Sequence, residues 1–218
     1  MKKILILIFS VLLLNITLSA QKKELITVKA GHKILDYFPV STRYMYSEFT
    51  TGRVVLKSGK YSESKFNYNF LLSEIEYIQA RDTLTIINKK DLKYIVVTQD
   101  TFYYDNGYIE QLRDGSVRVG MKQFIELKEV QNLDSYGVAS SGSATNSYGS
   151  LPVDGNFYKL SANKDMIFQK TIRYYIATPE SGFVIFNKKN MMQLYPQDED
   201  KIKSYLKTNK VNFESQED

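Results

Sequence analysis

The 218-residue chain contains no cysteine, no tryptophan and only one histidine. The absence of cysteine excludes a disulfide scaffold, cysteine-based zinc sites, thiol catalysis and lipidation of an N-terminal cysteine. A single histidine excludes most histidine-based metal sites and catalytic triads. The phosphate-binding pattern GxxxxGK[ST], the dinucleotide pattern GxGxxG and the zinc-protease pattern HExxH are absent as well. We therefore expect no cofactor, no bound metal and no catalytic residue.

The chain begins with the pattern of a secretory signal peptide. Met1, Lys2 and Lys3 precede an apolar run over residues 4–14, and small and polar residues then lead to Ala20. A basic start, an apolar stretch too short to span a bilayer and a small residue at the cleavage point are typical of such a peptide. We expect residues 1–20 to be removed and the protein to reach the periplasm, the outer membrane surface or the exterior.

The charge of the remaining chain is mild. Without Lys2 and Lys3, 27 basic side chains face 24 acidic ones, so the net charge is +3. No basic run is longer than two residues. This distribution does not favour nucleic-acid binding. The expected partner is an envelope protein or a glycan, with membrane association only through a partner.

The first half of the chain reads as short strands joined by turns. Tyrosine and phenylalanine are abundant, at 17 and 12 residues, and both favour strands. The pair Ser58-Gly59 predicts a hairpin between strands at 53–57 and 60–69, and Asn106-Gly107 predicts another between 101–104 and 108–112. Residues 92–98 are the most strongly strand-forming and predict a central strand. Val117 and Val119 indicate a short strand, and residues 123–130 a separate one.

The second half predicts strands at 157–160, 166–177 and 183–186, followed by helices. Asn187 is placed to cap a helix over 188–195, which Pro196 ends. The acids Asp198 to Asp200 suit the start of a second helix. A stripe of apolar side chains would dock this second helix on the sheet. The stripe consists of Ile202, Tyr205 and Leu206.

These observations predict a mainly β protein of the α+β class. We expect an antiparallel sheet, arranged as a sandwich or a partly closed barrel, with one or two short C-terminal helices. The expected organisation is a signal peptide (1–20), a lead-in (21–44), a β-rich part (45–135), a flexible Gly/Ser-rich loop (136–152), strands with the C-terminal helices in the same domain (153–213), and a tail (214–218).

Several short segments between residues 48 and 213 form a recognisable pattern. They are Glu48 to Val54, Asn67-Tyr68-Asn69, Asp82-Thr83-Leu84, Tyr94 to Val97, Phe102-Tyr103, Phe186 to Lys189, Pro196 and Lys210 to Phe213. This pattern resembles secreted β-rich proteins of Bacteroidota for which no function is assigned. The resemblance covers most of residues 48–213 and implies no activity, because its motifs carry no chemistry.

Few residues are candidates for chemistry. His32 lacks a recognisable nucleophile and is expected to be an ordinary exposed or half-buried side chain. Glu74 and Glu76 share one face of a predicted strand, as a carboxylate pair would, although the alternation favours a solvent-facing edge with Ile75 and Tyr77 inward. The acids at 198–200 fit a helix start better than a cation site.

Tyrosines near the flexible loop could form a recognition surface, because tyrosine combines an apolar face with a polar tip. Tyr136 and Tyr148 are the candidates for such a surface. The leading hypothesis is a non-catalytic binding or scaffolding module of the cell envelope. One alternative is a small outer-membrane β-barrel. The other is a hydrolase that uses Glu74 and Glu76.

Overall fold

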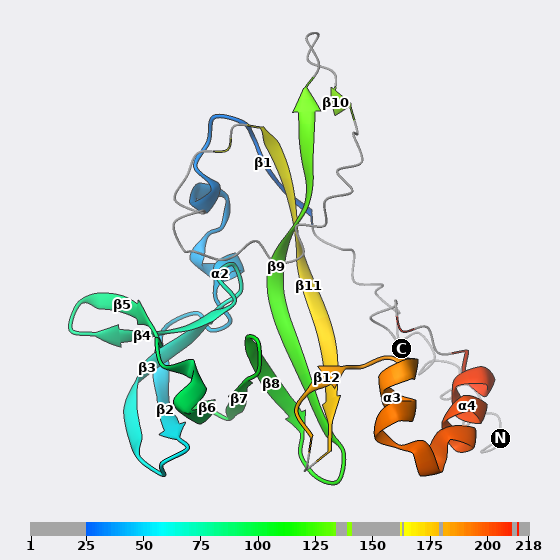
Figure 1. Ribbon diagram of the computed structural model, residues 1–218. Helices are drawn as coiled ribbons and strands as arrows, with labels where there is room; N and C mark the ends of the chain where they lie inside the picture. Colours follow the sequence, from blue (N-terminus) through cyan, green and yellow to red (C-terminus); the bar gives the residue numbers. More distant parts are fainter. Residues whose placement is uncertain are drawn as a thin grey trace, which may run out of the picture.

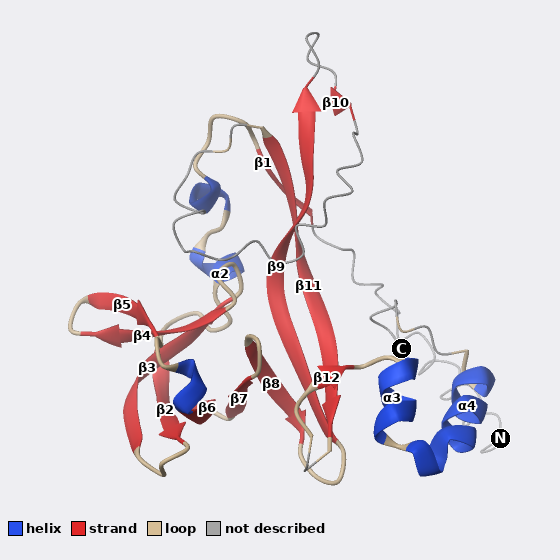
Figure 2. Ribbon diagram, viewed as in Figure 1, coloured by secondary structure: helices blue, strands red, loops and turns tan. Residues whose placement is uncertain are grey.

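The computed structural model describes residues 25–133, 139–140, 162, 164–178, 181–210 and 213 (Figure 1). These residues form one large, mainly antiparallel β-sheet with a few short helices, as the sequence predicts (Figure 2). Within the described ranges, none of the helices has both the length and the apolar composition needed to cross a membrane. The signal peptide, the tail and most of the Gly/Ser-rich loop predicted from the sequence lie outside the described residues, and so do Tyr136 and Tyr148.

The main path of the sheet runs in the order β1-β11-β9-β8-β7-β6-β2-β3-β4-β5, with β10 paired to β9 and β12 paired to β11. The path does not close on itself, so the described strands form an open sheet. The strands are β1 (Leu25–Val28), β2 (Thr50–Leu56), β3 (Tyr61–Asn69), β4 (Glu74–Gln79), β5 (Asp82–Thr85), β6 (Leu92–Val97), β7 (Asp100–Tyr104), β8 (Tyr108–Arg113), β9 (Arg118–Leu133), β10 (Ala139–Ser140), β11 (Asp165–Ala177) and β12 (Val184–Ile185).

The helical elements are short, and all but η2, which lies between β5 and β6, are near the two ends of the described chain. They are the 3-10 turns η1 (Ile34–Tyr37), η2 (Lys89–Asp91) and η4 (Pro196–Asp198), and the helices α2 (Val40–Arg43), α3 (Lys188–Leu194) and α4 (Glu199–Thr208). Asn187 caps α3 as predicted, because its Oδ1 accepts a hydrogen bond of 2.8 Å from the backbone N–H of Asn190. α4 begins at the predicted acids.

The predicted docking of α4 on the sheet is wrong. α4 packs beside α3 and the turn η4, and Figure 1 shows the helix pair to one side of the strands. Tyr205 of the predicted stripe is 64% exposed. A stripe of three apolar residues can pack against a neighbouring helix as well as against a sheet. The helical spacing of these residues does not indicate which of the two it contacts.

The turn signals and the central strand are confirmed. Gly59 adopts φ +85° between β2 and β3, and Val54 faces Ser62 across that hairpin. Asn106 and Gly107 both have positive φ, as expected, although the register leaves three residues between Tyr104 and Tyr108 rather than two. β6 lies in the middle of the sheet between β7 and β2.

The strands predicted at 117–119 and 123–130 are a single strand, β9, which is 16 residues long. Gly120 lies within it, and an added Cβ there would come 2.5 Å from Cγ2 of Ile109. The glycine therefore marks a close approach of neighbouring groups, not a break in the strand. β9 and β11 pair over most of their length and form the long ribbon in Figure 1.

The core lies on one face of the sheet, called here the inner face. The segment from η1 to α2 covers part of it, where the ring of Phe38 meets that of Phe168 edge to face at 5.3 Å. Farther along the sheet, Tyr68 stacks on Phe102 with ring centroids 5.8 Å apart. The opposite side is called the outer face.

Candidate functional site

The sequence candidates Glu74 and Glu76 lie on β4, one on each side of Ile75 along the strand. The expectation that both face solvent is wrong for Glu76, which is 8% exposed and accepts a 3.0 Å hydrogen bond from Nδ2 of Asn69. Glu74 forms an ion pair with Lys89. Burial raises the pKa of Glu74, while Lys89 opposes that shift.

Both carboxylates are therefore bonded to neighbouring side chains of this chain. Beside Glu76, its cross-strand partner Asn67 is held by the segment before β2, where the backbone of Tyr46 exchanges hydrogen bonds with the side chain of Asn67. The alternation of residues within β4 does not reveal this contact, because Tyr46 lies 21 positions before Asn67 in the sequence. Neither glutamate lines the pocket described below.

The remaining sequence candidates lie apart from one another. His32 is exposed, and its ring meets that of Tyr37 edge to face at 5.7 Å. Asp198 and Glu199 form ion pairs with Lys201 and Lys203 at the start of α4, which agrees with a helix-start role. Within the part of the chain that the structure describes, no group of three or more metal-ligating side chains comes together.

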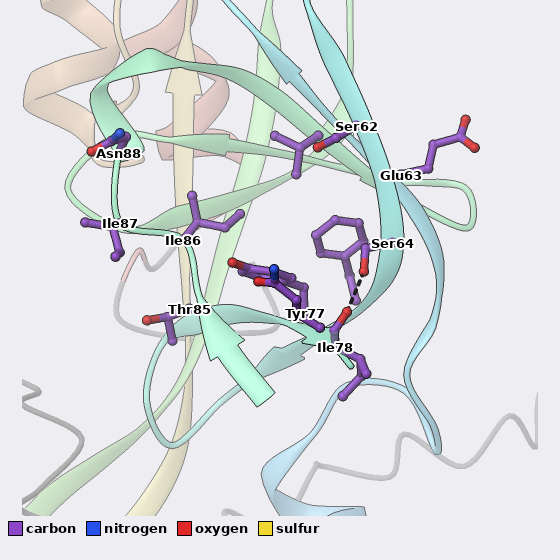
Figure 3. A pocket seen from close by; sticks show the side chains of 12 residues that line it. Ser62, Glu63, Ser64, Tyr77, Ile78, Thr85, Ile86, Ile87 and Asn88 are labelled. Carbon is purple, nitrogen blue, oxygen red and sulfur yellow. Dashed lines mark hydrogen bonds between the residues drawn. The ribbon is translucent and has the colours of Figure 1, made fainter. Parts of the chain in front are cut away.

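A pocket of about 480 Å³ lies on the inner face at the β5 end of the sheet (Figure 3). β2, β3 and β4 form its floor, and the connection after β5 forms its far wall. The side chains of Tyr77 and Ile86 approach each other inside it, whereas Glu63 points away from it (Figure 3). The lining residues are Val54, Ser62, Glu63, Ser64, Phe66, Tyr77, Ile78, Gln79, Thr85, Ile86, Ile87 and Asn88.

The floor of the pocket depends on a glycine. Gly52 on β2 has no side chain, and an added Cβ would lie 2.5 Å from the carbonyl oxygen of Val96 and 2.8 Å from Cδ2 of Phe66. The ring of Phe66 therefore comes close to the backbone of β2 at Gly52. A glycine inside a strand often marks a place where another group packs closely, so the sequence alone could have indicated this contact. Our sequence reading placed Gly52 before the strand, whereas β2 begins at Thr50.

The far wall is a short strap, residues 85–88, which runs from β5 to η2. Just beyond it, Nζ of Lys57 donates a 2.7 Å hydrogen bond to the carbonyl oxygen of Lys90, and the backbone N–H of Lys57 bonds to Asp91. Opposite the strap, Oγ of Ser64 donates to the carbonyl oxygen of Ile78 at 2.9 Å and ties β3 to β4. Hydrogen bonds thus hold both the floor of the pocket and the chain next to its far wall.

The lining combines apolar side chains with uncharged polar groups. The rings of Phe66 and Tyr77 lie with centroids 6.1 Å apart, and Ile87 is 89% exposed at the pocket. Hydroxyl and amide groups supply donors and acceptors around these apolar groups, from Ser62, Thr85, Gln79 and Asn88. The only carboxylate in the lining, that of Glu63, is paired with Arg53 at 2.7 Å. Such a lining can hold an apolar group and orient it by hydrogen bonds.

Comparison with known proteins adds no assignment, since no family model, no curated protein and no solved structure matched this chain.

Proposed function

We propose that this protein is a non-catalytic binding module of the cell envelope and that the pocket beneath the strap holds an uncharged, mainly apolar group of its ligand. The observation that supports this most directly is the lining of the pocket. Aromatic and aliphatic side chains surround about 480 Å³, and the polar groups among them are hydroxyls and amides. Ligand pockets commonly measure about 300–1,000 Å³ and have this mixture of groups.

The neutral lining favours binding over acid–base catalysis. General acid–base chemistry needs a titratable side chain within hydrogen-bond reach of the reacting group. The two glutamates of the hydrolase hypothesis are instead bonded to Lys89 and Asn69, and Glu63 points out of the pocket.

The proposed envelope location depends only on the signal-peptide pattern of residues 1–20. Mass spectrometry of protein isolated from its host should find a chain that starts at Gln21.

The neutral dye Nile red, whose fluorescence increases in apolar surroundings, tests the pocket. We expect saturable binding at one site, and we expect the variant Ile87→Asp to weaken that binding. Ile87 lines the pocket but is 89% exposed, so its substitution should leave the fold intact. The control is Leu84→Asp on β5, where an exposed apolar residue outside the pocket receives the same charge. Equal weakening in both variants, or no saturable binding, would contradict the proposal.

A further inference from the structure

Aromatic side chains form a row across the outer face of the sheet. Tyr61 on β3 lies opposite Val55, which lies opposite Tyr94 on β6. The ring of Tyr103 on β7 is 6.2 Å from that of Tyr94, and the ring of Phe183 is 6.0 Å from that of Tyr103. From β3 to β9 the sheet order makes five steps, about 24 Å at the usual spacing of about 4.8 Å.

The row continues onto the β9–β11 ribbon. An added Cβ on Gly120 would lie 3.1 Å from the ring of Phe183, so Gly120 faces the same side as the row. Alternate residues of a strand share a face, and Lys122 and Phe124 therefore face outward with it. Tyr175 pairs with Gly120, and Arg173 pairs with Lys122, so these two β11 side chains share that face too.

A cationic group lies near most of these rings. Each cation is between 4.7 and 5.4 Å from a ring centroid, within the range of cation–π attraction. The pairs are Arg53 with Tyr61, Arg118 with Phe183, Lys122 with Tyr175, and Arg173 with Phe124. Two of the cations also donate to backbone carbonyl oxygens, Arg118 to those of Thr178 and Ser181 and Lys122 to that of Asn106.

Two of these cations are cross-strand neighbours, and neither forms an ion pair within the described residues. Lys122 and Arg173 are direct cross-strand partners, and like charges in that position repel. Within the described part of the chain neither side chain forms an ion pair, although Asp105 lies near enough to Lys122 to act on it electrostatically. The pKa of Lys122 is lowered first by burial and then by Arg173. This arrangement makes folding less favourable and suits a bound anion.

We propose that the outer face is a docking surface for an acidic polysaccharide, with Lys122 and Arg173 binding its carboxylate groups. A face that extends over several strands suits a chain-like ligand. Guanidinium and ammonium groups pair well with carboxylates. Aromatic faces carry partial negative charge and attract the slightly positive C–H groups of a sugar ring. Aromatic rings and cations lie side by side from Arg53 and Tyr61 on one side of the row to Arg173 and Phe124 on the other.

Two other partners fit this face less well. A lipid surface would need protruding apolar side chains, yet of the large hydrophobic residues on the row only Tyr61 is strongly exposed, at 63%. A nucleic acid carries a phosphate at every unit and requires an uninterrupted positive surface. Here Glu63 lies beside Arg53 and Asp105 lies near Lys122, so acidic groups interrupt the positive charge.

The test uses a fluorescently labelled oligogalacturonate, a chain of uronic acid units, and measures its anisotropy against the full chain at low salt. The variant Lys122→Gln/Arg173→Gln removes both cations. A matched control, Lys33→Gln/Lys207→Gln, removes the same charge from exposed positions outside this face. We expect the first variant to bind about tenfold or more weakly, since one charge-assisted contact supplies that much. The control should bind like the wild type.

Thermal melting separates binding from folding. Because the two cations repel each other, Arg173→Gln should not lower the melting temperature, while it should weaken binding of oligogalacturonate. Equal weakening in the control variant would overturn the proposal, because net charge alone would then explain the binding. Tighter binding of a thymidine oligonucleotide, lost in the same variant, would overturn it in favour of a nucleic acid. This proposal is independent of the pocket, since Ile87→Asp should leave oligogalacturonate binding unchanged.

Discussion

Asp165 on β11 binds Lys29, a residue 136 positions earlier in the chain, just after β1. Oδ2 of Asp165 lies 2.7 Å from Nζ of Lys29, and its Oδ1 accepts a 2.8 Å hydrogen bond from the backbone N–H of Ala30. These two bonds, from Lys29 first and Ala30 second, lower the pKa of Asp165. The carboxylate therefore fixes the end of β1 onto the long ribbon.

The stability contributed by Asp165 should depend on pH. A carboxylate whose pKa is lower in the folded state stabilises the fold above its ordinary pKa of 3.8, and this contribution is lost as the pH falls through the folded-state pKa. We expect Asp165→Asn to unfold at lower urea concentration at pH 7 and to show a smaller further loss at acid pH. Urea titrations at both pH values check this. An unchanged midpoint at pH 7 would show that the bonds to Asp165 do not stabilise the fold.

Glu110 should behave in the opposite way. It is 9% exposed, and burial, followed by the nearby Asp100, raises its pKa above 4.5. A carboxyl with a raised pKa favours the fold most below pH 4.5, and that advantage disappears as the pH rises through the folded-state pKa. We expect Glu110→Gln to raise the melting temperature at pH 7 and to change it little at pH 4. The new amide can still accept the 3.4 Å hydrogen bond from Gln123.

Gly52→Ala tests the packing beneath the pocket. The added methyl group would press on a backbone carbonyl and on Phe66, so one of the two must shift. Overpacking of this kind costs about 1–3 kcal/mol, and we expect a loss of that size in the free energy of unfolding. Nile red binding should weaken as well, because Phe66 lines the pocket. The neighbouring variant Thr51→Ala changes an exposed side chain and serves as the control.

The sequence Asn-Lys-Lys occurs twice and allows a matched comparison. Asn187 accepts a hydrogen bond from the first turn of α3, whereas Asn88 forms no side-chain bond at the start of η2. Loss of an N-cap bond typically costs about 1 kcal/mol. We expect Asn187→Ala to lower the free energy of unfolding by about that amount and Asn88→Ala to change it little. Equal effects in chemical denaturation would mean that the cap does not stabilise α3.

The parts of the fold that the sequence predicts are those that depend on neighbouring residues. Ser58-Gly59 and Asn106-Gly107 mark turns because glycine and asparagine tolerate positive φ, and Asn187 marks a helix start through a bond three residues away. These signals act over a few positions, so they survive in any tertiary arrangement. They place the strands and the first C-terminal helix well.

The pocket could not be predicted in the same way, because its lining depends on how distant strands approach one another. Val54, Tyr77 and Ile86 come from β2, β4 and the strap, and each taken alone is an ordinary apolar residue. The hydrogen bond to Glu76 likewise comes from outside its own strand. Gly52 is the one residue at the pocket whose role the sequence could indicate, because a glycine within a strand suggests that another group approaches closely.

The pairing of β1 with β11 also governs the order in which the sheet can form. Leu25 lies opposite Gln169, so β1 cannot find its partner until nearly the whole described chain is available. Contacts this distant in sequence carry a large loop-closure cost and make folding slow. The hairpins β2–β3 and β7–β8 can form early from local contacts, whereas β1 should be among the last strands to join the sheet. Pulse-labelling hydrogen exchange during refolding should therefore protect the amides of β1 late.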